Sequence, residues 1–282
     1  MKKEIMLQRK ANEIRERTLE MCIKAGTGHI TSSFSCAELL STLYFGGVMN
    51  YDSKDPEWDG RDRFILSKGQ ASPILYVTLA KAGFFPEEWL NTFCEDKGHF
   101  GVHLQCDVPG VEFTTGSLGH GLGLGVGKAL AAKMNGKDYH TFVMLGDAEL
   151  QEGSNWEAAM YASQAKLGNL TAMVDRNGYG VLCPTEKSSG LNSLEKKFKA
   201  FGWKVDSIDG HSTKELLKTL QSQKSYNKNK PRMIIAYTTK GKGIKSWENV
   251  ALRHGTAPQG EEAIQTTMEL KNYISRGEYE HR

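Results

Sequence analysis

The sequence predicts an α/β protein with a doubly wound, mostly parallel sheet and helices on both faces. Two short apolar runs, residues 141–145 and 170–174, flank a helical segment. Such runs are typical of buried parallel strands joined through a helix. A third buried-strand pattern covers residues 233–237. Because no internal repeat, linker or low-complexity segment interrupts residues 1–282, we expect a single domain.

Composition agrees with a globular domain and argues against several other protein classes. Hydrophobic residues make up 39% of the 282 residues and charged residues 24%, which is ordinary for a globular protein. The net charge of +3 is too small to indicate nucleic-acid binding. No run approaches the roughly 18 apolar residues of a membrane helix, and no signal peptide is visible. Five cysteines without a C-x-x-C pair indicate reduced thiols, so we expect a cytoplasmic protein.

Most of the remaining elements are expected to be helices. Apolar residues form an approximate stripe along 3–25, which predicts an amphipathic helix that ends at Gly26. Ser33 or Ser35 is expected to cap a second helix over 37–44. Further helices are expected at 72–82, 86–93, within 191–206, at 213–223 and at 261–273, with a polar, basic loop over 224–232.

Polar residues directly follow two of the predicted strands. Gly146 and Asp147 follow the first, and Asn177 follows the second. The carboxyl ends of parallel strands meet at one edge of the sheet, where ligands bind in open α/β folds. One carboxylate and one amide oxygen suit Mg²⁺, and the Gly146 backbone can approach a phosphate because it lacks a Cβ. Taken alone, the pair also fits an acid at a strand end and an asparagine in a tight turn.

A glycine-rich segment, residues 114–127, precedes this region. Its glycines fit neither the dinucleotide pattern G-x-G-x-x-G nor a P-loop, which argues against a nucleotide-binding module. The interpretation left for this segment is a helix of small residues that packs closely under a cofactor or against a partner helix.

Three phrases occur in an order that resembles the transketolase family of thiamine diphosphate enzymes. They are GHITSS at 28–33, the glycine-rich segment with Gly146-Asp147 and Asn177, and KGKG at 240–243 followed by His254-Gly255. The resemblance covers nearly the whole chain. It implies the thiamine diphosphate-binding fold of the diphosphate-binding (PP) type. It also implies thiamine diphosphate and Mg²⁺ as cofactors, with Ca²⁺ or Mn²⁺ as alternative metals.

The resemblance also implies roles for individual residues. The implied metal ligands are Asp147, Asn177 and a backbone carbonyl near Tyr179. The implied cofactor-binding residues are Gly116, Ser117, Leu118, Gly146, Asp147, Ala148, Glu152, Asn177, His254 and Gln70. The implied catalytic residues are His29, His103 and His254.

Some of these residues have a second interpretation. His29 corresponds to a family histidine that moves protons to substrate oxygens, but a loop histidine bonded to backbone is the alternative. Glu152 corresponds to a member of an acidic network at a dimer interface, or it lies on the surface in the first turn of a helix. Lys240, Lys242 and Lys245 are expected on a solvated face.

Two positions depart from the family pattern. Gln70 stands where the family has histidine, and glutamine can donate a hydrogen bond but cannot carry charge or move protons. The histidine phrase before PGVE is altered, and His103 lies nearest to the expected place. In the family, both positions lie in the part of the active site that binds the substrate. We therefore expect a donor other than an ordinary pentose phosphate, such as apulose phosphate or a sulfonated sugar.

The resemblance covers only the first of the three domains of a full transketolase. The pyrimidine-binding domain, with its catalytic glutamate, and the C-terminal domain are expected on a separate chain. The predicted function is therefore that of one half of a split transketolase, expected to work as an α₂β₂ assembly that transfers a two-carbon ketol unit from a ketose to an aldehyde. One alternative is a protein like the α chain (E1α) of 2-oxo acid dehydrogenases, or like deoxyxylulose phosphate synthase, which decarboxylates a 2-oxo acid. The other is a catalytically silent scaffold that binds the cofactor.

Overall fold

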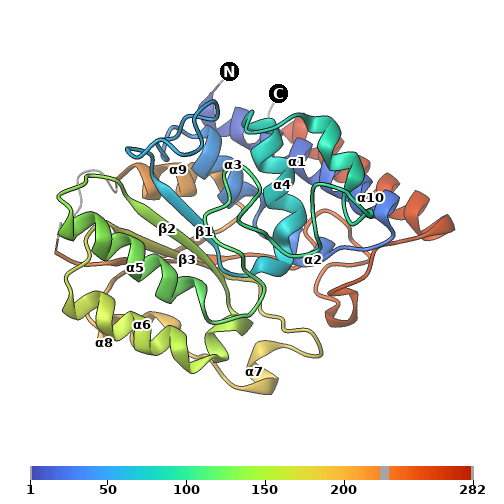
Figure 1. Cartoon of the computed structure of the whole chain (residues 1–282). Helices are drawn as coiled ribbons and strands as arrows, with labels where there is room; N and C mark the ends of the chain where they lie inside the picture. The colour runs from blue at the N-terminus through green and yellow to red at the C-terminus, as the bar shows by residue number, and fades with distance from the viewer. Residues whose placement is uncertain (1, 223–228, 281–282) are drawn as a thin grey trace.

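A single parallel sheet forms the centre of the molecule (Figure 1). The structure, a computed structural model, describes residues 2–222 and 229–280, so most of the predicted loop over 224–232 lies outside the described residues. The strand order is β1-β2-β3-β5-β4, and every neighbouring pair is parallel. The strands are β1 (Arg63–Leu66), β2 (Thr141–Gly146), β3 (Leu170–Arg176), β4 (Lys204–Asp209) and β5 (Arg232–Tyr237). The predicted α/β fold is confirmed.

Helices cover both faces of the sheet, because the central strands are apolar on both sides. Along β2, Phe142 and Met144 pack into one hydrophobic core, while Val143 and Leu145 pack into the other. The first core contains helices α1 (Lys3–Ala25), α2 (Ile30–Phe34), α3 (Ala37–Phe45), α4 (Ser72–Lys81), α9 (Thr213–Gln221) and α10 (Gly260–Glu280). The second contains α5 (Gly121–Met134), α6 (Gly153–Gln164) and α8 (Leu194–Ala200), which lie together on the opposite side of the sheet in Figure 1.

The ends of the strands are level at the carboxyl edge. Gly146 of β2 pairs with Asp175 of β3, and Asp175 pairs with Ala236 of β5. The loops that leave these three strands therefore begin side by side, and they carry most of the polar residues singled out in the sequence.

Most predicted helices are confirmed, with differences at their ends. Helix α1 ends at Gly26, whose φ of 67° is left-handed. The segment expected as a helix at 86–93 is a 3₁₀ helix, Glu87–Thr92. The final helix continues beyond the predicted residue 273 to Glu280. Among the described residues, none of the helices combines the length and apolarity required to cross a membrane.

The predicted serine cap of α3 is wrong. Cys36 occupies the N-cap position without a side-chain cap, and Ser33 lies inside α2. The Ser35 hydroxyl instead donates a hydrogen bond to Asp175 Oδ2 at 2.5 Å. A buried carboxylate must be satisfied by hydrogen bonds, and this requirement directs Ser35 away from the helix end.

Candidate functional site

Asp147 and Asn177 meet at the carboxyl edge of the sheet, as the sequence predicts. The Asp147 carboxylate is 1% exposed and accepts hydrogen bonds from the backbone N–H groups of Gly178 at 2.7 Å and Ala148 at 2.8 Å. Asn177 Oδ1 accepts a hydrogen bond from the Tyr179 N–H at 3.1 Å. Gly178 has a φ of 81°, which favours glycine, so the turn after β3 can close onto the turn after β2.

The environment of Asp147 suits a cation. Burial raises the pKa of its carboxyl to about 6, and the nearby charge of Asp175 adds to this shift. Arg176, with Nη1 3.0 Å from Oδ2, offsets only part of it. Among the described residues there is no group of three or more His, Cys, Asp and Glu side chains that could hold a metal. The oxygens near the Asp147 carboxylate are those of the Asn177 amide and of the backbone, and such oxygen ligands suit Mg²⁺.

A buried ion pair lies directly beneath this edge. Lys68 Nζ lies 2.5 Å from Asp175 Oδ2 and donates to the Ser32 carbonyl at 2.6 Å. Ser35 and Thr238 also donate to the Asp175 carboxylate. Burial alone would raise the pKa of Asp175, but the Lys68 charge and these hydrogen bonds lower it. Asp175 is therefore a structural anion that ties the end of β3 to α2 and to the loop after β5.

The predicted cofactor loop at Gly116–Leu118 lies against the turn that contains Gln70. Gln70 Nε2 donates to the Gly116 carbonyl at 2.7 Å. A Cβ on Gly69 would lie 2.6 Å from the Gly116 nitrogen, so only glycine permits this close approach. Leu118 is half-buried, whereas Ser117 is exposed. The uncharged side chain of Gln70 thus supports the backbone of the loop.

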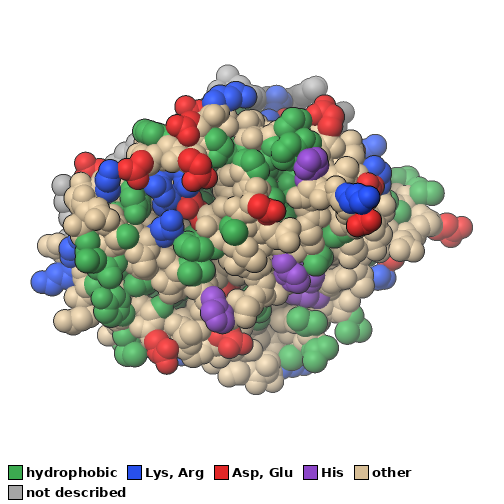
Figure 2. Space-filling model, viewed as in Figure 1, with side chains coloured by type: hydrophobic (Ala, Val, Ile, Leu, Met, Phe, Trp, Pro, Cys, Tyr) green, Lys and Arg blue, Asp and Glu red, His purple; other side chains and the backbone are tan. Residues whose placement is uncertain are grey.

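The three histidines predicted as catalytic form one cluster. The ring of His29 lies between those of His103 and His254, with centroid distances of 6.2 and 5.2 Å. Histidine side chains are visible on the face of the molecule shown in Figure 2. The Nδ1 atom of His29 is buried and has no hydrogen-bond partner among the described residues, which argues against a loop histidine bonded to backbone through this atom.

Both His29 and His254 are neutral at neutral pH. Burial, followed by the charges of His103 and Lys240, lowers the pKa of His29 to about 4. Burial, followed by the charge of Lys240, lowers the pKa of His254 to about 3. A neutral imidazole has one nitrogen that can donate and one that can accept, so these rings can exchange protons with a bound group.

Lys240 corrects one expectation, because it does not lie on a solvated face. It is 1% exposed, and its Nζ donates to the Gly180 carbonyl at 2.8 Å and to His254 Nδ1 at 2.9 Å. The loop after β5 folds onto α2 through the Gly241 N–H and the Thr31 carbonyl, 2.9 Å apart, and this contact encloses the lysine. Burial lowers the pKa of Lys240 to about 8. Lys242 and Lys245 remain partly or fully exposed.

Replacing Lys240 with methionine should raise the pKa of His254. The lysine charge is the second cause of the lowered value, after burial. Because the ring stays buried, its pKa should remain below the ordinary value of about 6.5. An NMR titration of the imidazole nitrogens measures this change. Lys242→Met is the matched control, since Lys242 lies over the ring of Tyr273 instead, and an equal response in both variants would contradict the assignment.

Glu149 is a buried site residue that the sequence patterns did not indicate. This glutamate is 1% exposed and accepts hydrogen bonds from Ser67, from the Gly119 N–H at 2.9 Å and from the Gly146 N–H at 3.0 Å. It therefore joins the glycine-rich segment to the end of β2. The one available signal was its position two residues after Asp147. Glu152, which was predicted instead, is exposed at the start of α6, and its interface role remains a prediction.

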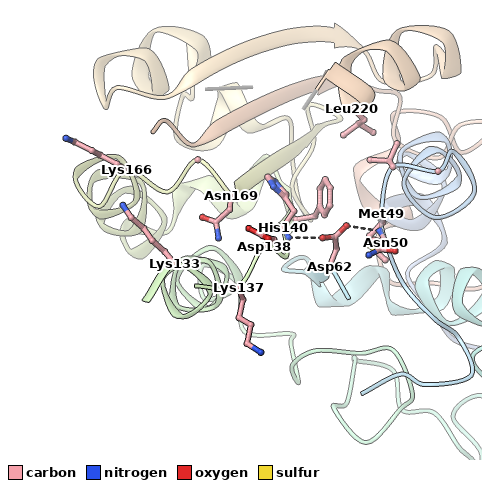
Figure 3. Close-up of a pocket in the computed structure, with 14 residues that line it drawn as sticks. Met49, Asn50, Asp62, Lys133, Lys137, Asp138, His140, Lys166, Asn169 and Leu220 are labelled. Atoms are coloured by element: carbon pink, nitrogen blue, oxygen red, sulfur yellow. Dashed lines mark hydrogen bonds between the residues drawn. The ribbon is translucent and has the colours of Figure 1, made fainter. Parts of the chain in front are cut away.

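A large cavity lies away from these residues. It has a volume of about 880 Å³ and lies at the opposite edge of the sheet, where the strands begin (Figure 3). Lys133, Lys137, His140 and Asn169 line it, together with Asp62, which accepts hydrogen bonds from the Asn50 and His140 N–H groups, both at 2.7 Å. None of the predicted site residues lines this cavity.

Comparison with known proteins identifies the family of this chain. The family profile described as the thiamine diphosphate-binding domain of transketolase matches residues 6–274. The chain is 39% identical over 275 residues to one of the subunits of the apulose-4-phosphate transketolase of Phocaeicola vulgatus, covering 98% of this chain and 97% of the relative. It is 41% identical over 254 residues to a 6-deoxy-6-sulfo-D-fructose transketolase subunit of a Clostridium species, covering 89% and 91%.

Longer transketolases match through only part of their length. Human transketolase is 40% identical over 268 residues, which cover 94% of this chain and 42% of the human protein. The crystal structure of Campylobacter jejuni transketolase superposes with a TM-score of 0.87 at 30% identity, covering 96% of this chain and 45% of that one. The chain thus spans less than half the length of these two proteins. It belongs to the transketolase family, in which it corresponds to the thiamine diphosphate-binding domain.

Proposed function

We propose that this chain is the N-terminal subunit of a split transketolase, which transfers a two-carbon ketol unit from a ketose to an aldehyde. The observation that carries the proposal is the match, over nearly their full lengths, to relatives that are named as transketolase subunits. Residues 1–282 would form one domain. A second chain would supply the pyrimidine-binding and C-terminal domains, including the glutamate that contacts the aminopyrimidine.

The residues at the carboxyl edge fit a metal ion bound to a diphosphate. Asp147, Asn177 and the backbone carbonyl of Tyr179 would supply oxygen ligands to Mg²⁺, and Ca²⁺ or Mn²⁺ could use the same ligands. The buried carboxylate of Asp147, whose charge is only partly offset by Arg176, supports this role. The backbone at Gly146 and Ala148, the 116–118 loop and His254 would contact the cofactor.

Thiamine diphosphate supplies, when bound, a centre that accepts the electron pair of the bond next to a ketose carbonyl. The histidine cluster would manage the protons. His29, whose buried Nδ1 has no hydrogen-bond partner within the described part of the chain, would donate or accept a proton at a substrate oxygen. Lys240 donates to His254 Nδ1, so the proton of that neutral ring is at Nε2. His103, which lies against Gly116, would contact the hydroxyl groups of the donor.

We propose an unusual ketose as donor in place of an ordinary pentose phosphate. Gln70 and the altered phrase around His103 support this, as do the names of two relatives, which specify apulose-4-phosphate and 6-deoxy-6-sulfo-D-fructose. A coupled assay that compares these two donors with xylulose 5-phosphate tests the idea. If xylulose 5-phosphate is the best donor, the specificity proposal is wrong while the transketolase assignment stands.

The proposed assembly is an α₂β₂ heterotetramer in the cytoplasm. One face of α5 and α6 supports a contact with another chain. A Cβ at Gly123 or Gly127 would meet no atom of the described residues within 4 Å, and the neighbouring Met160 and Tyr161 are each 51% exposed. All five cysteines are free, which agrees with a reducing compartment.

Calorimetric titration of thiamine diphosphate in the presence of Mg²⁺ tests the proposed function. The titration is run with the chain alone, with the candidate partner alone and with their mixture, followed by a coupled activity assay. We expect tight binding and turnover only in the mixture. Turnover by the chain alone would contradict a split enzyme, and binding without turnover of any ketose would favour a silent scaffold.

A further inference from the structure

His211 connects two parts of the molecule through both of its ring nitrogens. It lies between β4 and α9, and its side chain is 16% exposed. Its Nε2 lies 2.8 Å from the Thr239 N–H, and its Nδ1 lies 3.0 Å from Glu38 Oε2. A backbone N–H can only donate, so Nε2 must be the acceptor. The ring proton is therefore at Nδ1, where it is donated to Glu38, and one neutral tautomer satisfies both contacts.

The Glu38 side of this connection is firmly held. Glu38 is completely buried on α3, and Arg15 of α1 donates to both of its oxygens, at 2.6 and 2.5 Å. Gln8 donates a further hydrogen bond at 2.9 Å. Arg15 is itself fixed by the Phe34 carbonyl, with Nη2 at 2.9 Å. His211 is thus oriented by an ion pair that belongs to the packed core of α1 and α3.

The other side of the connection leads to the proposed cofactor site. Thr239 directly precedes Lys240, whose Nζ contacts the Gly180 carbonyl and His254 Nδ1. Strand β5 ends at Tyr237, and the Thr238 N–H still bonds to the Arg176 carbonyl of β3, at 3.2 Å. The next backbone N–H, that of Thr239, has left the sheet and bonds to His211 instead. His211 therefore fixes the chain at the point where it turns toward Lys240.

We propose that His211 is a positioning residue of the transketolase site. By accepting the Thr239 N–H, it sets the place of Lys240 and, through Lys240, the orientation and tautomer of His254. The inference rests on the proposed function, in which His254 and its loop contact the cofactor.

Two amide substitutions separate the two contacts of the ring. In His211→Gln, the side-chain oxygen can replace Nε2 and accept the Thr239 N–H, while the contact with Glu38 is lost. In His211→Asn, the shorter amide can replace Nδ1 and donate to Glu38, but it does not reach Thr239. Losing the Thr239 contact should weaken thiamine diphosphate binding about 10-fold in the Asn variant, whereas the Gln variant should stay within about 3-fold of the wild type.

The measurement is calorimetric titration of thiamine diphosphate with Mg²⁺, using each full-length variant mixed with the partner chain. The unfolding temperature is recorded for each. If the wild-type mixture does not bind thiamine diphosphate, the result contradicts the proposed function and does not contradict the role of His211. If the wild type binds and the two variants bind equally, whatever their unfolding temperatures, the positioning role is wrong. It is also wrong if the Gln variant is the weaker one.

A measurement on the wild-type chain keeps the proposal testable if the Asn variant does not fold. Nitrogen NMR should show His211 protonated at Nδ1 alone, and the Thr239 amide should exchange slowly with solvent. A proton at Nε2 of His211, or rapid exchange of the Thr239 amide, would overturn the proposal.

Discussion

Replacing Asp147 with asparagine is expected to weaken Mg²⁺-dependent binding of thiamine diphosphate at least about 100-fold, because a neutral amide is a much poorer ligand for a divalent cation than a carboxylate. The substitution keeps the shape of the side chain. Its oxygen can still accept the N–H group of Gly178, which bonds to Asp147 at 2.7 Å. Calorimetry on the mixed subunits measures the loss.

The same substitution should stabilise the chain without its cofactor. Burial raises the pKa of Asp147 to about 6, so the group favours folding at acid pH, and this contribution is lost as pH rises through about 6. Asparagine carries no charge. At pH 7.5 the free energy of unfolding should therefore rise by roughly 1–3 kcal/mol, and the difference from the wild type should shrink at pH 5. Urea denaturation at the two pH values measures both quantities.

Glu186→Gln is the matched control for Asp147→Asn. Glu186 also pairs with Arg176, at 2.5 Å, but its side chain is 37% exposed, whereas that of Asp147 is 1% exposed. We expect cofactor affinity to stay within about 2-fold of the wild type, because an exposed ion pair contributes little. Equal losses in the two variants would show that Arg176, and not a metal ligand, carries the effect.

Replacing Lys68 with methionine should lower the free energy of unfolding by about 3–5 kcal/mol, because it leaves the buried carboxylate of Asp175 without a cation. In the wild type, the lowered pKa of Asp175 favours folding above the ordinary aspartate pKa, and this contribution is lost as pH falls through the folded value. In the variant, the pKa of Asp175 should rise instead. The deficit, measured by urea denaturation, should therefore be largest near pH 7.5 and smaller at pH 5.

The double variant Lys68→Met, Asp175→Asn controls for the volume of the side chains. It removes both charges and keeps hydrogen-bonding groups for Ser35 and Thr238, which bond to Asp175 in the wild type. We expect it to recover much of the stability that the single variant loses. If the double variant is as unstable as the single one, the loss comes from packing of the lysine stem and not from an unpaired charge.

Local sequence patterns predicted the elements that depend on local chemistry. Apolar runs located β2, β3 and β5, and the residues after β2 and β3 indicated the edge where Asp147 and Asn177 meet. The prediction succeeded because buried parallel strands require continuous apolar residues, and because their carboxyl ends share one edge. The resemblance to transketolases then grouped His29, His103 and His254, whose rings lie together in the structure.

Only the tertiary structure decided which charged side chains are buried and what they contact. Lys240 was expected in solvent, but the loop that follows β5 folds onto α2 and encloses it. Glu38 and His211 are 173 residues apart in the sequence, so no local pattern could join them. Burial of a charge depends on partners brought together by the whole fold, and such partners leave no periodic signal in the sequence. The sequence by itself determined the family, the strands β2, β3 and β5 and the edge where Asp147 and Asn177 meet, while the packing of distant segments decided how these residues are held in place.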